Sequence, residues 1–233
     1  MLAIISDIHA NLEALDATFA AGMKLGVDEW ICLGDVVGYG ANPNECVERV
    51  AALCSVVLFG NHDEAAIGGM DLSWFNPWAA EAAQWTIGAL TPDSRKFLSE
   101  RPYRHETGLA TFVHSTPVAP EEWNYVLRQS DARAQATGFA TPFCFVGHSH
   151  CPGVFPVDPV EATSEPRHLI NVGSVGQPRD GDPRACMVVL TEAQDSEPDI
   201  RLVRLKYDVE AAQRKIIEAG LPEMLARRLE VGA

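Results

Sequence analysis

Basic residues are scarce in this chain. Lys and Arg together number 18 against 32 Asp and Glu, which gives a formal net charge of −14. Nucleic-acid backbones and anionic membranes repel such a chain, because they carry charge of the same sign. The shortage therefore disfavours a protein that binds long DNA or RNA, and one that lies on a membrane surface.

Long apolar runs and cysteine frameworks are also missing. No stretch approaches the roughly 18 apolar residues that cross a bilayer, and Met1–Asp7 lacks the basic start of a signal peptide. The six cysteines include no Cys-x-x-Cys pair, so we interpret them as reduced thiols that are mostly buried, with Cys144 and Cys151 as packing residues. These absences predict a cytoplasmic protein.

The composition is that of a folded protein. Of the 233 residues, 47% are hydrophobic and 21% are charged, which is usual for a globular chain with a core. The length suits one domain, or one domain with an insertion. We predict a single domain over residues 1–233 with a helical, cap-like insertion at about 64–107.

Apolar periodicity predicts an α/β fold. The first sixty residues alternate strands at 2–6, 29–33 and 55–59 with helices at 11–25 and from Asn42 or Asn44 to Cys54. This order predicts a parallel sheet with right-handed crossovers. Residues 64–107 are expected to be mainly helical. Later strands are expected at 111–114, 143–146, 153–156, 168–171, 185–190 and 200–205, and later helices at 129–137, 209–219 and 223–229.

Polar residues gather where the predicted strands end. The five clusters are Asp7-Ile8-His9, Gly34-Asp35, Gly60-Asn61-His62-Asp63, His114 and Gly147-His148-Ser149-His150. The carboxyl ends of strands in an open α/β sheet face a common crevice, so we expect these residues to lie together. Any one cluster alone is typical of a turn or a helix cap, and only the set of five indicates a site.

The clusters contain the residue types of a metal site. Five of the seven histidines lie in them, together with Asp7, Asp35, Asn61 and Asp63. Neutral imidazole and carboxylate oxygen suit Mn, Fe, Co, Ni or Zn. So many groups exceed the needs of one ion but suit two ions that share a bridging carboxylate. Two metals roughly 3.5–4 Å apart support in-line phosphoryl displacement.

The same five clusters resemble the signature motifs of calcineurin-like metallophosphoesterases, from about residue 4 to 150. The stretch Asn-Val-Gly-Ser-Val-Gly-Gln-Pro-Arg at 171–179 is similar to small bacterial and archaeal members, which extends the resemblance to roughly residue 190. The resemblance implies an α/β protein built as a four-layer αββα sandwich around two metals, with a small helical insertion.

The resemblance also implies a role for each matched residue. Asp7, His9 and His150 would hold the first metal, Asn61, His114 and His148 the second, and Asp35 would bridge them. Hydroxide activated by the metals would attack phosphorus. His62 matches the catalytic histidine of the family, and it would stabilise the transition state or protonate the leaving oxygen.

One departure from the family pattern narrows the range of expected substrates. Protein Ser/Thr phosphatases of this family carry Gly-Asp-x-Val-Asp-Arg-Gly in the second motif, where this chain has Gly-Asp-Val-Val-Gly-Tyr-Gly. Gly38 thus replaces the Asp that orients the catalytic histidine, and Tyr39 replaces a phosphate-binding Arg. This disfavours a protein phosphatase and favours the phosphodiesterase-like branch. Asp63 cannot be assumed to replace the missing Asp.

Two further features allow more than one interpretation. Arg179 either forms a surface ion pair with Asp180 or Asp182, or binds substrate phosphate as a guanidinium does well. Trp74, Trp78 and Trp85 either pack in the core of the insertion or cap the site and stack on a nucleobase or aryl group. Pro77 makes a continuous helix from residue 74 unlikely and suits the first turn of a helix that starts there.

We therefore expect a dinuclear metal-dependent phosphoesterase that hydrolyses small phosphodiesters or nucleotides. The alternatives are a symmetrical dinucleoside-polyphosphate hydrolase or a phosphomonoesterase of the same family, then a non-catalytic scaffold and a nuclease. Two divalent transition-metal ions are expected, with manganese favoured over Fe, Co, Ni or Zn. Their charge would make the site attractive to a small anion inside an acidic shell. The sequence allows a homo-oligomer without requiring one.

Overall fold

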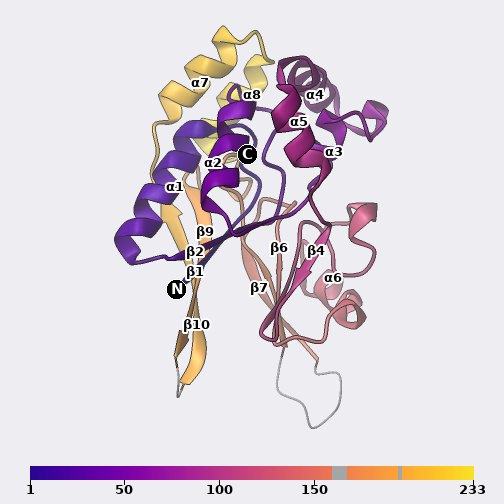
Figure 1. Ribbon diagram of the computed structural model, residues 1–233, viewed down its shortest axis with the longest axis vertical. Coiled ribbons are helices and arrows are strands. Elements are labelled where there is room, and N and C mark those ends of the chain that lie inside the picture. The colour runs from indigo at the N-terminus through magenta and orange to yellow at the C-terminus, as the bar shows by residue number, and fades with distance from the viewer. Residues whose placement is uncertain (159–166, 194–195) are drawn as a thin grey trace.

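The computed structural model describes residues 1–158, 167–193 and 196–233, and it contains two five-stranded sheets with helices outside them (Figure 1). The first sheet has the order β10-β9-β1-β2-β3, with β1 at Leu2–Ile5, β2 at Glu29–Cys32, β3 at Val56–Val57, β9 at Ala185–Ala193 and β10 at Ser196–Leu205. The second has the order β4-β5-β6-β8-β7, with β4 at Arg104–Glu106, β5 at Ala110–Val113, β6 at Phe143–Val146, β7 at Gly153–Val157 and β8 at Arg167–Asn171.

Helices connect and cover these strands. The α-helices are α1 Leu12–Leu25, α2 Pro43–Leu53, α3 Asn61–Ala66, α4 Pro77–Ala89, α5 Pro92–Ser99, α6 Gln129–Ala134, α7 Val209–Glu218 and α8 Glu223–Val231. Short 3₁₀ turns lie at η1 Leu72–Trp74, η2 Pro120–Glu122 and η3 Ala136–Gly138. None of the helices within the described ranges has the length and apolar character needed to cross a membrane.

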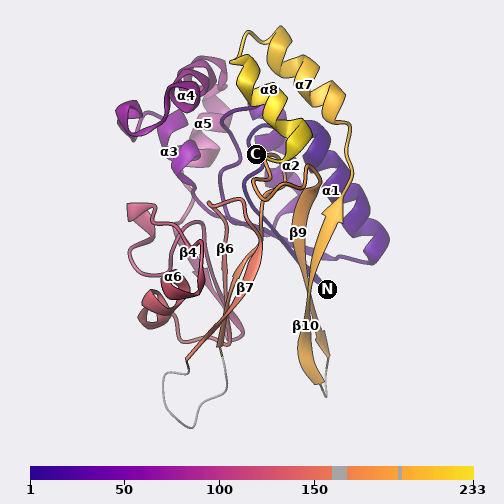
Figure 2. The same cartoon turned by 180° about the vertical axis from the view of Figure 1, so that it is seen from behind.

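The side chains of the central strands alternate between separate cores. Ile5 on β1 packs with α1 and α2, whereas its neighbour Ile4 packs between the two sheets. On β6, Phe145 shares that inter-sheet core while Cys144 packs toward α6. Such strands are buried on both faces, which explains their continuous apolar sequences. The layers are helix, sheet, sheet and helix (Figures 1 and 2), so the predicted four-layer α/β sandwich is confirmed.

The first sheet is only partly parallel. β1, β2 and β3 pair in parallel as the sequence predicts, but β9 runs antiparallel to β1 and β10 antiparallel to β9. A parallel neighbour requires a crossover of a dozen or more residues, and only two residues separate β9 from β10. The parallel sheet predicted from the first sixty residues is therefore confirmed for β1, β2 and β3, and that prediction gave no direction for β9 and β10.

Local signals set the helix ends as expected. The Asn11 side chain accepts a hydrogen bond from the Ala14 backbone N–H at 3.1 Å and so caps α1. Gly26 ends that helix with φ at 85°, a left-handed conformation that glycine adopts without steric cost. Pro43 and Pro77 occupy the first turns of α2 and α4, where a missing backbone N–H costs nothing.

Residues 64–107 are not helical throughout. Helices α3, α4 and α5 gather beside the sheets (Figure 1), but Arg104–Glu106 forms the edge strand β4, antiparallel to β5. This strand is three residues long and polar, so only its partner strand, and not a pattern of its own, fixes its conformation. That the segment is a cap-like insertion in one domain stays a prediction.

Candidate metal centre

The chain turns that follow the strands bring the predicted ligands together. Asp7 follows β1, Asp35 follows β2, His114 follows β5, and His148 and His150 follow β6. Asn61 opens helix α3 after β3 and lines the same pocket as Asp35, His148 and His150. All seven of the predicted ligand side chains are buried. The expectation that the clusters meet in one place is confirmed.

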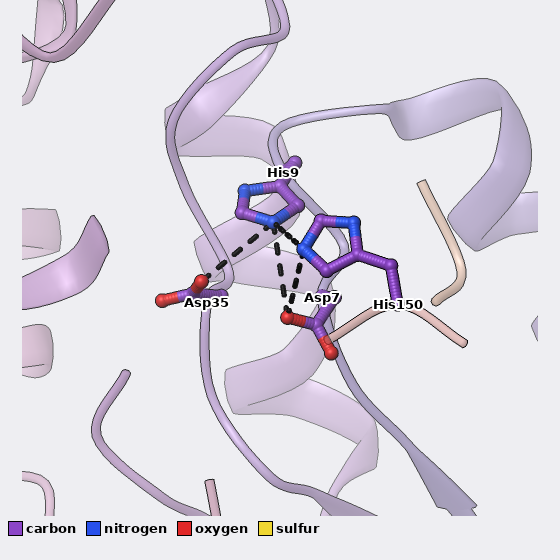
Figure 3. Close-up of side chains that lie close together, drawn as sticks. All are labelled: Asp7, His9, Asp35 and His150. Atoms are coloured by element: carbon purple, nitrogen blue, oxygen red, sulfur yellow. Dashed lines mark hydrogen bonds and ion pairs between the residues drawn. The ribbon is translucent and has the colours of Figure 1, made fainter. Parts of the chain in front are cut away.

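Four of these residues form one compact group: Asp7, His9, Asp35 and His150 (Figure 3). His9 Nε2 lies 3.8 Å from Asp7 Oδ1 and 3.6 Å from Asp35 Oδ2. His150 Nε2 lies 3.3 Å from Asp7 Oδ1 and 3.1 Å from His9 Nε2. Carboxylate oxygens and imidazole nitrogens from three segments distant in sequence thus converge on one small volume.

Asp35 also belongs to a second group, with His114 and His148. His114 Nε2 lies 3.4 Å from Asp35 Oδ2, the same oxygen that faces His9. Each of the two groups could hold a metal ion, and they have Asp35 in common. The assignment of each residue to one of two metals stays a prediction.

Backbone carbonyls fix which histidine nitrogen faces the groups. His9 Nδ1 lies 3.1 Å from the Val37 carbonyl, and His150 Nδ1 lies 2.5 Å from the Gln177 carbonyl. His148 is held by its other nitrogen, because its Nε2 lies 2.9 Å from the Trp123 carbonyl. A carbonyl only accepts, so each of these nitrogens donates and the opposite nitrogen carries a lone pair. Sequence reasoning missed these carbonyl partners, which no residue type signals.

Asp7 and Asp35 are likewise each held through one of their two carboxylate oxygens. His148 donates its backbone N–H to Asp7 Oδ2 at 3.0 Å, and His62 donates its backbone N–H to Asp35 Oδ1 at 2.8 Å. Their other oxygens, Asp7 Oδ1 and Asp35 Oδ2, are buried without a hydrogen-bond partner among the described residues, as is Asn61 Oδ1. A buried polar atom without a partner costs about 1–3 kcal/mol. A shared cation would remove that cost, so the donor set fits divalent transition metals.

Burial and neighbouring charges control the protonation of the site. Burial lowers the pKa of His62 to about 4 and that of His148 to about 3, so both rings are neutral at pH 7. Burial would also lower the pKa of His114, but the charge of Asp35 outweighs it and raises that pKa to about 9. In the metal-free protein, a proton on His114 thus compensates part of the negative charge of Asp35.

Five of the candidate ligand residues have a strained backbone conformation. Asp7, His9, Asp35, His148 and His150 all have φ between 51° and 66°, the left-handed region that residues with a Cβ rarely adopt. Hydrogen bonds between the turns hold this conformation, among them one from the Ile8 N–H to the Asp35 carbonyl at 2.9 Å. Strain that persists against its cost is typical of functional sites.

His62 lies beside this centre, in the first turn of α3. Its ring packs between Tyr39 and Phe75, at centroid distances of 4.4 and 4.8 Å, and its Nδ1 is buried without a partner. A Cβ at Gly38 would lie 2.6 Å from that nitrogen, so no larger side chain fits there. Residue 38 therefore faces His62, as the motif comparison implied, but supplies no carboxylate.

Asp63 does not replace the missing carboxylate. Its two oxygens accept hydrogen bonds from the backbone N–H groups of Val37 and Gly60, at 3.1 and 3.2 Å. Burial and the neighbouring charge of Asp35 raise the pKa of Asp63 to about 8. Asp63 therefore braces two turns of the site instead of orienting His62.

Arg179 is directed toward the centre. Its guanidinium donates to Tyr39 Oη at 3.2 Å, and it lines a pocket of about 130 Å³ together with Asp35, Asn61 and His62. Asp180 pairs with Arg204 and Asp182 with Arg184, so neither forms the surface ion pair considered for Arg179. Tyr39, which replaces the phosphate-binding Arg of the protein phosphatases, thus contacts another Arg.

A second guanidinium approaches from the C-terminal helix. Arg228 on α8 lies 4.4 Å above the Tyr39 ring and donates to the side-chain oxygen of Gln177. The backbone carbonyl of Gln177 is the partner of His150. Sequence reasoning did not identify Arg228, because nothing in the helical pattern separates it from the neighbouring Arg227.

The three tryptophans do not share one helix face. Trp74 belongs to η1 and is 82% exposed, Trp78 is 47% exposed in the first turn of α4, and Trp85 packs against the cluster around α7 and α8. Helix α4 begins at Pro77, which confirms the prediction that Pro77 lies in the first turn of a helix and that no continuous helix runs from residue 74. Of the three, Trp74 lines the pocket beside His62.

Metal binding is expected to raise the stability of this protein. An ion at 100 times its Kd at one site adds about 2.7 kcal/mol, and 1 kcal/mol shifts Tm by about 2–4 °C at this chain length. Adding Mn²⁺ to metal-stripped protein should therefore raise Tm by about 5–11 °C in a thermal melt, and EDTA should reverse the shift. Mg²⁺ prefers oxygen ligands and serves as the control, with a smaller effect. Identical melts with and without Mn²⁺ would contradict the fit described above.

The chain is similar to known proteins along most of its length. The family model for the calcineurin-like phosphoesterase superfamily domain matches residues 1–195. An uncharacterised protein of Methanocaldococcus jannaschii is 38% identical over 244 residues, which cover 100% of this chain and 98% of that protein. The crystal structure of a metallophosphoesterase from Sphaerobacter thermophilus is 39% identical with a TM-score of 0.86, over 100% of this chain and 98% of that one. A hypothetical protein from Pyrococcus horikoshii shares the fold, at 18% identity and a TM-score of 0.82 over 100% and 99% of the two chains.

Proposed function

The chain belongs to the calcineurin-like phosphoesterase superfamily, and we propose that it is a dinuclear metal-dependent phosphoesterase that hydrolyses small phosphodiesters or nucleotides. The observation that carries this proposal is the pair of buried groups that share Asp35 Oδ2, with ligand atoms that have no other partner. A purely structural cluster would satisfy these atoms within the protein.

The residues present divide into those that would hold metal and those that act on substrate. Asp7, His9 and His150 would hold one ion, Asn61, His114 and His148 the other, with Asp35 between them. Bound divalent ions would lower the pKa of water and attract a phosphoryl oxygen. The carbonyl contacts of His9, His148 and His150 keep their lone pairs directed at the ions without further adjustment.

His62 acts as a neutral hydrogen-bond donor to the phosphoryl group in this proposal. Its ring lines the pocket beside the ligand groups, and burial lowers its pKa to about 4. Among the described residues no carboxylate hydrogen-bonds to its ring, since Gly38 supplies none and Asp63 is bonded elsewhere, and burial outweighs the charge of the nearby Asp35. Stabilising the transition state therefore suits this histidine better than giving up a proton.

The experiment that tests the proposal is metal-dependent turnover of bis-p-nitrophenyl phosphate, measured together with the metal content of the purified protein. We expect hydrolysis that EDTA abolishes and Mn²⁺ restores, with about two ions per chain. Comparison with p-nitrophenyl phosphate separates a diesterase from a monoesterase. A protein that binds two ions but hydrolyses neither ester would instead be a scaffold.

Arg179 is expected to contribute to substrate binding. A hydrogen bond from a charged group contributes about 1.5–3 kcal/mol, so Arg179→Met should raise KM by roughly 10- to 150-fold with a smaller effect on kcat. Steady-state kinetics on the diester measure this. Arg184→Met is the matched control, because Arg184 is exposed and pairs with Asp182. An unchanged KM in Arg179→Met would exclude the contact.

A further inference from the structure

The pocket above the ligand groups has two chemically different parts. Its lining includes the buried polar residues Asp35, Asn61 and His148 and also three aromatic residues, Trp74, Phe75 and Tyr125. At about 130 Å³ it has room for a small group only. A substrate whose phosphoryl group lies against the buried polar residues would therefore extend toward the exposed side of the pocket, where the solvent-exposed residues of the lining include Trp74 and Tyr125.

Trp74 presents an unusually large apolar surface at this position. It is 82% exposed, although tryptophan is among the most buried residues on average. Its position is nevertheless fixed. Asp71 caps the η1 turn by accepting from the Ser73 N–H at 2.9 Å, and the ring of the next residue, Phe75, packs on His62. The exposure of Trp74 thus comes from an anchored turn.

Tyr125 supplies a second aromatic ring, which is also anchored. It stacks on His148 with ring centroids 4.1 Å apart and an interplanar angle of 16°, and it is 51% exposed. Two residues earlier in the same loop, Trp123 donates its Nε1–H to Glu64 Oε2 at 3.0 Å and offers its carbonyl to His148. Tyr125 therefore keeps its place beside the ligand groups while about half of it stays open to solvent.

We propose that Trp74 and Tyr125 form an aromatic subsite for a nucleobase, so that the substrate class is nucleotides and not simple alkyl phosphoesters. This inference rests on the proposed function and adds the part of the substrate that carries no phosphate. The two kinds of lining match the two parts of a nucleotide: Arg179 and the metal ligands face its anion, and the aromatic rings face its neutral, planar base.

The continuity of the surface favours a substrate over a protein partner. Trp74 and Tyr125 line one pocket together with His62 and Asn61, so a group that stacks on them is already in reach of the phosphoryl position. Trp78 is also exposed but lies outside this lining, and it gives a matched control.

Calorimetric titration of the Mn²⁺-loaded protein with adenosine monophosphate and with methyl phosphate tests the subsite. Both ligands carry the same phosphate group, so the ratio of their affinities reports the contribution of the nucleoside, and the part of that ratio lost on truncating Trp74 reports the base. Stacking of one base on an aromatic side chain corresponds to about 5- to 150-fold in affinity. We expect wild-type protein to favour adenosine monophosphate by a factor in this range.

Trp74→Ala should reduce that preference by at least about fivefold and leave the affinity for methyl phosphate unchanged, whereas Trp74→Phe should retain most of it. Trp78→Ala should behave as wild type.

An equal preference in wild type and Trp74→Ala, or no preference in wild type, would overturn the subsite while leaving the proposed function intact. Failure of both phosphates to bind would overturn the subsite alone if bis-p-nitrophenyl phosphate is still hydrolysed, and the proposed function as well if it is not. Because Trp74 is exposed, the variant should melt at the wild-type temperature.

Discussion

Asp35→Asn is expected to lower the rate of phosphodiester hydrolysis by more than about 100-fold, the upper end for residues that only support a metal ligand. Asp35 Oδ2 lies within 3.6 Å of His9 Nε2 and 3.4 Å of His114 Nε2, so one oxygen serves both groups. The amide keeps the shape of the side chain and removes its charge, so the metal content should fall from about two ions per chain to one or fewer.

Asp180→Asn is the control for this substitution. Asp180 is an exposed carboxylate that pairs with Arg204, and its loss should change neither activity nor metal content. Elemental analysis by mass spectrometry and steady-state kinetics measure both quantities on the same samples. Full activity with two ions in Asp35→Asn would rule out a bridging role for Asp35.

His62→Asn is expected to lower kcat by about 10²- to 10⁴-fold, the usual contribution of a positioned catalytic histidine, without changing the metal content. The reason is that His62 faces the pocket but is absent from both ligand groups. A loss of kcat without a loss of metal would distinguish the role of His62 from that of Asp35.

The leaving group distinguishes the two roles considered for His62. If it acts as a neutral hydrogen-bond donor, the loss in kcat should be similar for esters with aryl and alkyl leaving groups. If instead it protonates the leaving oxygen, the loss should be much larger for the alkyl ester, because an aryl oxide departs readily without a proton. A larger alkyl deficit would therefore contradict the role proposed above.

Most of the framework could be predicted from the sequence because its strands have strong local patterns. The apolar run of β6 was predicted with its observed bounds, and Gly26 and Pro77 mark helix ends for reasons that do not depend on the rest of the fold. β4 could not be found, since a three-residue polar strand takes its conformation from the neighbouring β5. The direction of β9 likewise depends on a partner that is distant in sequence.

The same distinction applies to the site. Its seven candidate ligands could be predicted because their residue types follow strands, and strand ends meet in space. Tyr125 and the carbonyls of Val37, Trp123 and Gln177 could not, since a loop without periodicity and a backbone atom leave no trace in the sequence. The sequence thus indicated the chemistry of the centre but not the groups that orient it.

The contacts of Arg228 extend the site into a helix that the family match does not include. The match ends at residue 195, whereas α8 begins at Glu223. Arg228 donates to the side-chain oxygen of Gln177, and the backbone carbonyl of the same residue holds His150. Helices open and close locally in native proteins. An opening of α8 would break the hydrogen bond between Arg228 and Gln177. We therefore expect fluctuations of the last helix and of the ligand cluster to be coupled, so that an occupant that orders one slows amide hydrogen exchange in the other.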